Sequence, residues 1–150
     1  ATDIIGIHDY DANTEHLRQR YGPEIKTEQL FDRRRPGGRV LTLDGYPHRG
    51  QPIMLTEFGG IALARANSPT APHTWGYSTA KDTDELAVLF EQLIEAVVHT
   101  ALFSGFCYTQ FADTFQEANG LLRADRTPKI PLARIAKATT ASRTYIPGAA

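Results

Sequence analysis

Three short apolar segments of strand length are spaced along the chain. They are DIIGIH at residues 3–8, PIMLT at residues 52–56 and GFCYTQ at residues 105–110. None of them alternates apolar and polar residues strictly, and such runs are typical of strands that are covered on both faces, as in a parallel sheet. The pattern therefore predicts three buried, parallel strands.

Helical patterns lie between and after these segments. The one at residues 14–21 is stopped by a Gly-Pro pair, and the one at residues 82–102 carries a stripe of apolar residues along one face. Pro131 fits the first turn of a last helix, in which we expect Leu132 and Ile135 to point inward. The order of elements is a β/α alternation, which favours parallel strands joined by right-handed crossovers.

Polar and aromatic side chains stand at the ends of all three predicted strands. In β/α folds the carboxyl ends of the strands form the active face, so we expect these side chains to share one site. The connections at residues 59–81 and 111–129 would lie over that face, and their length favours a function. The residues at the strand ends are His8, Asp9 and Tyr10 for the first strand, Glu57 for the second, and Tyr108 and Gln110 for the third.

Glu57 is the strongest candidate for chemistry. It ends an apolar strand and is followed by Phe58 and two glycines, which let the backbone turn sharply and leave the carboxylate at the mouth of the site. A carboxylate in this place can act as a nucleophile, as a base or as a structural acceptor. Tyr10 and Tyr108 can flank it and donate hydrogen bonds or stack on a flat apolar ligand face, with packing at the rim as the alternative for both.

A metal site in an unrelated small α/β protein is another use for the residues near the first strand. His8, Asp9 and Asp11 offer an imidazole and two carboxylates, and Glu57 offers a further carboxylate. Successive residues of a strand point to opposite faces, so His8 and Asp9 cannot both face one ion unless the strand ends there. We therefore predict no metal and no other cofactor.

Composition narrows the classes of function. The 150 residues carry 16 Lys and Arg against 17 Asp and Glu, a formal net charge of -1, so we expect no nucleic-acid partner. We expect no membrane association either, because no apolar stretch is long enough for a span and the chain does not open with the pattern of a signal peptide. The single cysteine, Cys107, excludes an internal disulfide, which favours the cytoplasm.

Three motifs together resemble the catalytic barrel of glycoside hydrolase family 2, which contains β-galactosidases, β-glucuronidases and β-mannosidases. TDIIGIHDY is similar to the sixth barrel strand, PIMLTEFGG to the seventh and GFCYTQFADTFQEANGLL to the eighth. The resemblance implies an α/β fold, a partial (β/α)8 TIM barrel made of roughly strands six to eight with their helices. Residues 1–150 would then be the C-terminal portion of that barrel, without strands one to five.

The resemblance also implies roles for the strand-end residues. Glu57 would be the nucleophile of a retaining β-glycosidase, with Tyr10 as the tyrosine beside it. Tyr108 would stand where the family places an aromatic residue against the sugar. Trp75 could close over the sugar ring, and anchoring of its own loop is the alternative. The remaining members of the expected sugar site are His8, Asp9 and Gln110.

One part of the family's machinery has no counterpart in this sequence. Retaining glycosidases need a second carboxylate, about 5–5.5 Å from the nucleophile, as acid and base. The family's acid/base glutamate belongs to an Asn-Glu pair, and no such pair occurs here. Asp9, Asp113 and Glu117 are the substitutes within the chain, whereas the resemblance implies a missing upstream segment as the source.

These observations predict the hydrolysis of β-glycosidic bonds with retention of configuration. We expect the 150 residues to be inactive alone, because an eight-stranded barrel takes about 200 residues or more. The partners would be a carbohydrate substrate and either the remainder of the barrel or another copy of the chain. The alternative is a non-catalytic carbohydrate-binding or interaction module derived from such a barrel.

Overall fold

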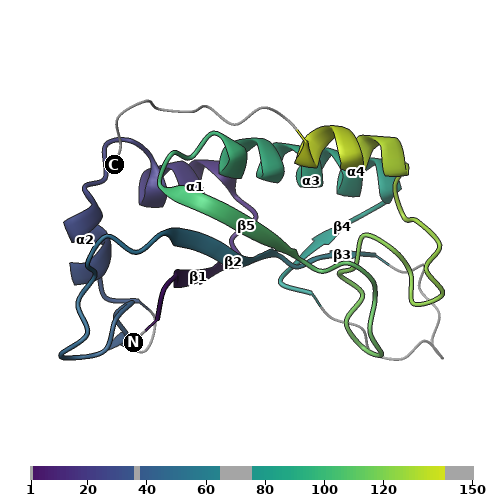
Figure 1. Cartoon of the computed structure of the whole chain (residues 1–150). Helices are drawn as coiled ribbons and strands as arrows, with labels where there is room; N and C mark the ends of the chain where they lie inside the picture. The colour runs from purple at the N-terminus through teal and green to yellow at the C-terminus, as the bar shows by residue number, and fades with distance from the viewer. Residues whose placement is uncertain (1, 36–37, 65–75, 141–150) are drawn as a thin grey trace.

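A three-stranded parallel sheet forms the centre of the fold. The computed structural model describes residues 2–35, 38–64 and 76–140. The strands are β1 (Ile5–Asp9), β2 (Ile53–Gly59) and β5 (Phe103–Thr109), in the order β1-β2-β5 (Figure 1). Both neighbouring pairs are parallel, so the predicted strands and their common direction are confirmed. The sheet is open rather than closed within the described part of the chain.

A bulge in β2 sets the register of the residues at the strand ends. Ile7 of β1 pairs with Leu55 of β2, but the next residue, His8, pairs with Glu57. Thr56 is therefore an extra residue on β2, and its hydroxyl donates a hydrogen bond of 3.2 Å to the carbonyl oxygen of Ile7. The bulge places Glu57 directly beside His8.

Helices α1 (Thr14–Tyr21) and α3 (Thr83–Val98) lie where the sequence predicts them. The N-terminus of α3 is capped by Asp82, whose carboxylate accepts a hydrogen bond of 2.8 Å from the amide of Glu85. The helix ends at Val98 rather than at residue 102, because a short turn leads from there into β5.

Two regions that the sequence pattern predicts to be connections contain regular structure. Helix α2 (Thr27–Asp32) precedes β2, and β3 (Ile61–Leu63) pairs in parallel with β4 (Ser78–Ala80) to form a separate two-stranded sheet. Each of these elements is too short for its hydrophobic periodicity to be distinguished from that of a loop.

Helix α4 (Leu132–Thr139) confirms the predicted last helix and corrects one detail of it. Ile135 packs against the core as expected, but Leu132 is 58% exposed, so the expectation that it points inward is wrong. Side chains in a helix lean toward its N-terminus, so the side chain of the first residue extends beyond the helix rather than over a neighbouring turn.

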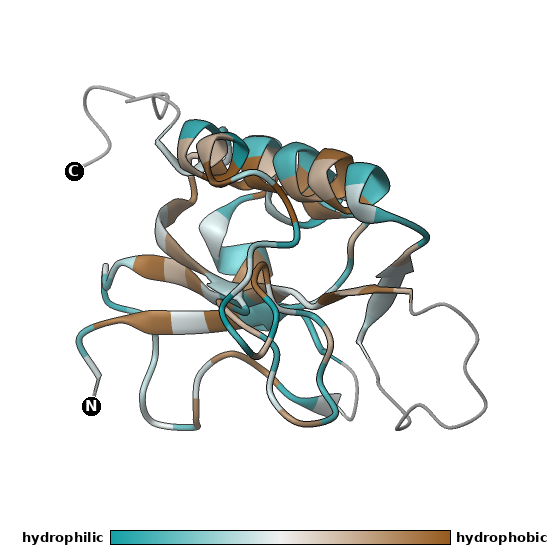
Figure 2. Ribbon diagram, turned by 90° about the vertical axis from the view of Figure 1, so that its right-hand side faces the viewer, coloured by the Kyte–Doolittle hydropathy of each residue, from teal (hydrophilic) through white to brown (hydrophobic). Residues whose placement is uncertain are grey.

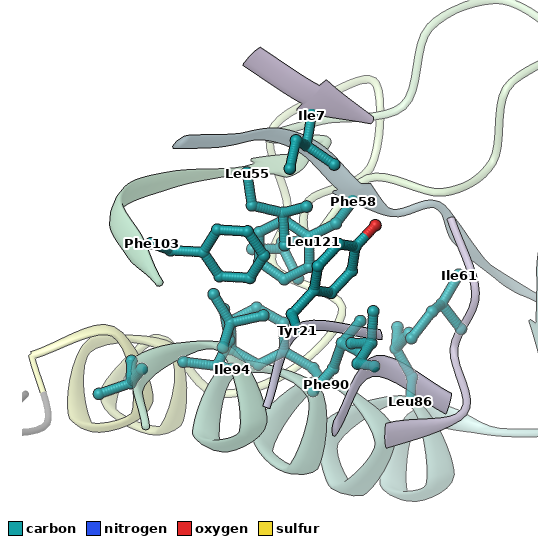
Figure 3. Packing of buried hydrophobic residues seen from close by; sticks show 14 of the residues in the cluster. Ile7, Tyr21, Leu55, Phe58, Ile61, Leu86, Phe90, Ile94, Phe103 and Leu121 are labelled. Carbon is teal, nitrogen blue, oxygen red and sulfur yellow. The ribbon is translucent and has the colours of Figure 1, made fainter. Parts of the chain in front are cut away.

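Helices α1, α3 and α4 cover one face of the parallel sheet (Figure 1), and the core lies between these two layers. The helices carry hydrophobic and hydrophilic residues together, as amphipathic helices do (Figure 2). Among the described residues, no helix is both long and apolar enough to cross a membrane. Large buried side chains that meet in the core include Leu55, Phe58, Phe90, Ile94 and Phe103 (Figure 3).

Truncation of Phe90 tests this account of the core. Phe90 is fully buried on α3, so we expect Phe90→Ala to lower the free energy of unfolding by about 3–5 kcal/mol through lost burial and a residual cavity. Val88 on the same helix is 45% exposed, so Val88→Ala should change the free energy of unfolding by about 0.5 kcal/mol or less. Urea unfolding of both variants provides the measurement, and equal losses would contradict the proposed core.

Candidate active site

Glu57 lies near the carboxyl end of β2, and two side chains from the end of β1 point at one of its oxygens. The Tyr10 hydroxyl donates a hydrogen bond of 2.7 Å to Glu57 Oε2. His8 Nδ1 lies 3.1 Å from the same oxygen. No hydrogen bond from a described residue reaches Oε1, and the Glu57 side chain is 43% exposed. One oxygen of the carboxylate is therefore held, whereas the other has no hydrogen-bond donor among the described residues, on a side chain that is partly exposed.

The turn after Glu57 requires glycine at two adjacent positions. Gly59 and Gly60 have φ angles of +95° and +64°, in the left-handed region that favours glycine. A Cβ atom on Gly59 would collide with the ring of Tyr108. A Cβ atom on Gly60 would lie 2.6 Å from Cδ2 of Tyr77 and 2.9 Å from Cδ1 of Tyr10. The aromatic rings can approach the backbone this closely only because both Cβ atoms are absent.

Tyr77 also belongs to the site, although no pattern in the sequence predicts it. Its ring stacks on that of Tyr10, with centroids 3.7 Å apart and an angle of 11° between the planes. The backbone amide of Tyr77 donates to the carbonyl oxygen of Gly60 at 2.9 Å, which ties the segment before β4 to the turn after β2. Tyr77 is 55% exposed and stands in a polar stretch, so no hydrophobic pattern distinguishes it.

The surroundings of Tyr10 favour the protonated form of its hydroxyl even more than in a free tyrosine. Burial and the hydrogen bond to Glu57 raise the pKa of Tyr10 to about 12, although the Thr109 side chain acts in the opposite direction. A tyrosine with this pKa is a neutral hydrogen-bond donor throughout the physiological pH range. Tyr10 can therefore orient Glu57 without competing with it for charge.

Asp9 faces away from Glu57, toward helix α1. Its carboxylate lies 2.9 Å from Nε of Arg20 and accepts a hydrogen bond of 2.7 Å from the Tyr21 hydroxyl. Arg20 also contacts Asp11, with 3.0 Å between Nη1 and Oδ2. These acidic groups join the end of β1 to α1, and they do not converge with Glu57.

This arrangement removes the donor set of the metal alternative, because Asp9 and Asp11 are committed to Arg20. Within the described ranges, no group of three or more His, Cys, Asp or Glu side chains is placed to hold a metal ion.

Tyr108 lies on the helix-covered side of the sheet rather than at the mouth of the site. Its ring is 5.4 Å from that of Phe58 and 5.0 Å from that of Phe90 on α3, both in edge-on contacts. Burial raises the pKa of Tyr108 well above its usual range. We therefore leave Tyr108 out of the proposed sugar-binding set.

The loop after β5 engages two more of the candidate residues. Gln110 donates a hydrogen bond of 2.7 Å from Nε2 to Oδ1 of the buried Asn119. Asp113 accepts one of 2.6 Å from the buried ammonium of Lys129. These contacts give both side chains a role in shaping the loop. Glu117 lies at a tight backbone turn of the same loop, and Trp75 lies outside the described residues.

No protein-family model and no curated protein matches the chain. Solved structures similar to it include a glycoside hydrolase family 2 β-galacturonidase from Eisenbergiella tayi, with a TM-score of 0.60 and 15% identity over 96% of this chain. A β-glucuronidase from Faecalibacterium prausnitzii has a TM-score of 0.55 and 18% identity over 96% of this chain. An agarase has a TM-score of 0.56 and 16% identity over 92% of this chain.

These similarities are of fold. The chain has a glycoside hydrolase-like fold, with identities too low to carry the activity of any of these proteins across. The matched region covers 24% of the β-galacturonidase, 23% of the β-glucuronidase and 18% of the agarase. The chain therefore spans about a quarter or less of the length of the proteins that it resembles.

A methyl group at Gly60 should break the link between Tyr10 and Glu57. We expect Gly60→Ala to push the Tyr10 ring away and to return its pKa from about 12 toward the ordinary value of 10.0. A pH titration followed by NMR of isotope-labelled tyrosine would measure this shift.

Gly50→Ala is the matched control for that variant. Gly50 has a φ of +86°, so alanine is strained there too, but no atom lies within 4 Å of its added Cβ. The Tyr10 titration should be unchanged in Gly50→Ala. If both variants gave the same titration, the contact at Gly60 would not position Tyr10.

Proposed function

We propose that the protein is a retaining β-glycosidase related to glycoside hydrolase family 2, in which Glu57 is the nucleophile. The observation that carries this proposal is the asymmetric setting of the carboxylate, in which Tyr10 and His8 contact Oε2 and no described residue donates a hydrogen bond to Oε1. The glycosidases among the similar structures support it. In this proposal the chain supplies roughly strands six to eight of a (β/α)8 barrel.

The proposed reaction has two steps. Oε1 of Glu57 attacks the anomeric carbon of a β-glycoside, and the bond from that carbon to the leaving oxygen breaks as the oxygen takes a proton from a second carboxyl group. A water molecule then attacks the same carbon, loses a proton to the second group and releases the sugar from Glu57. Tyr10 holds the carboxylate in position in both steps.

We propose that the second carboxyl group comes from outside these 150 residues. Asp9 is engaged by Arg20 and Tyr21, and Asp113 is engaged by Lys129 and by the amide of Gly120. A group held in this way cannot swing toward a leaving oxygen. The remainder of a barrel or another copy of the chain would supply it.

The proposed substrate is a β-linked carbohydrate that lies over Glu57. The stacked Tyr10 and Tyr77 offer an aromatic edge beside the carboxylate, and sugar rings pack their C–H faces on such surfaces. We also propose a cytoplasmic location, because Cys107 is a free, exposed thiol, and such thiols persist in reducing compartments.

Substitution and labelling of Glu57 test the proposed function. In the full-length protein, Glu57→Gln should lower the hydrolysis of aryl β-glycosides by at least ~10³-fold, because no covalent intermediate can form. A mechanism-based fluorosugar should label the unmodified protein at Glu57, as read by peptide mass spectrometry. Glu24→Gln, at an exposed position between α1 and α2, is the control and should leave hydrolysis nearly unchanged. A label at another residue would refute the assignment, and binding without turnover would favour a carbohydrate-binding module.

Removal of the Tyr10 hydroxyl tests the orienting hydrogen bond. Tyr10→Phe keeps the ring that stacks on Tyr77 but removes the donor to Oε2, so we expect kcat to fall by about 10²-fold. Tyr46→Phe, at a tyrosine that is 60% exposed, should leave kcat unchanged. An unchanged kcat in Tyr10→Phe would show that Glu57 does not depend on this bond.

A further inference from the structure

His8 is placed beside Glu57 by the bulge in β2. If β2 had no bulge at Thr56, the register would continue regularly and His8 would pair with Thr56 instead of with Glu57. The hydroxyl of Thr56 stabilises the bulge by its hydrogen bond to the Ile7 carbonyl. The bulge in β2 and its hydrogen bond to β1 therefore together bring His8 into contact with Glu57.

Packing does not account for the position of the His8 side chain, which is 59% exposed. Its described polar contact is the one from Nδ1 to Glu57 Oε2, at 3.1 Å. A proton on Nδ1 makes this nitrogen a donor to the carboxylate. His8 thus acts on the same oxygen as Tyr10 and leaves Oε1 alone.

Two donors on one oxygen make the two oxygens of Glu57 chemically different. Donors stabilise negative charge on the oxygen that they reach, and they oppose rotation of the carboxylate. Oε1 keeps its electron pairs available for attack. Once Oε1 is bonded to a sugar, Oε2 becomes the carbonyl oxygen of the ester.

We propose that His8 is a positioning residue that fixes Oε1 as the attacking atom and accelerates release of the sugar from Glu57. This inference rests on the proposed function and goes beyond the sugar-binding role expected for His8. In the release step, the oxygen of water bonds to the anomeric carbon and a water proton passes to the second carboxyl group. The bond from the anomeric carbon to Oε1 breaks, and its electron pair returns to the carboxylate. Negative charge then grows on Oε2, where His8 donates.

Two substitutions at His8 separate hydrogen bonding from packing. Asn carries an amide nitrogen two bonds from its Cβ, as His carries Nδ1, so His8→Asn can keep the donor. His8→Leu fills similar space without a donor. Because the side chain is largely exposed, both variants should unfold at the same urea concentration as the unmodified protein.

The choice of leaving group separates the two steps of the reaction. With a dinitrophenyl β-glycoside, sugar release limits turnover, and His8→Leu in the full-length protein should lower kcat about tenfold. The glycosyl-enzyme should accumulate and be visible by intact-protein mass spectrometry. With a poor alkyl leaving group, for which the first step is limiting, kcat should change much less. His8→Asn should restore most of the loss.

The outcomes distinguish this inference from the proposed function. Equal kinetics in His8→Leu and His8→Asn, or an equal loss with both leaving groups, would overturn the role of His8 while the fluorosugar label at Glu57 stood. A label elsewhere, or full activity in Glu57→Gln, would overturn the proposed function itself.

Discussion

Two adjacent glycines without Cβ atoms hold the site together. The turn at Gly59 and Gly60 is in close contact with aromatic rings on both sides, Tyr108 on the helix side and Tyr10 with Tyr77 on the other. The amide of Gly60 donates to the carbonyl of Thr109 at 2.7 Å, which joins β2 to the end of β5. Side chains on both faces of the sheet are thus positioned by one backbone turn. A Cβ atom at either position would move a ring, and with it either the core or the donor to Glu57.

The bulge at Thr56 lets β2 contribute both to the hydrophobic core and to the site around Glu57. Leu55 and Phe58 are both fully buried under the helices, although they are three positions apart and a regular strand would place them on opposite faces. The extra residue at the bulge shifts the alternation of faces by one position, so that Phe58 returns to the core side while Glu57 faces His8 and Tyr10. The strand can therefore end in a partly exposed carboxylate while Leu55 and Phe58 both stay buried in the core.

The sequence is sufficient for the elements whose signal is hydrophobic and long. Residues 3–8, 52–56 and 105–110 predict the three parallel strands, and α1 has the predicted bounds because its stop signal is a Gly-Pro pair. The sequence does not predict which side of the sheet each strand-end residue faces: it predicts Tyr108 at the mouth of the site, but the ring lies against Phe90. Irregular register in the pairing of β2 with β5 breaks the simple alternation of sides there. Tyr77 was missed because only its tertiary contacts, and no local pattern, bring it to Tyr10.

The four acidic residues considered for the site differ in how many of their oxygens are engaged by other side chains. Asp9 and Asp11 meet Arg20 of α1 and join the end of β1 to that helix, whereas Asp113 meets Lys129 of its own loop and closes the loop after β5. The ammonium of the buried Lys129 lies 2.6 Å from Asp113 Oδ1, and this ion pair holds the Asp113 carboxylate in place. Glu57 has neutral or weakly basic donors on one oxygen only and is partly open to solvent. A carboxylate that is fully engaged stabilises a structure, whereas one that is oriented but half free can react. By this criterion Glu57, alone among these four acidic residues, fits the nucleophile role that we propose.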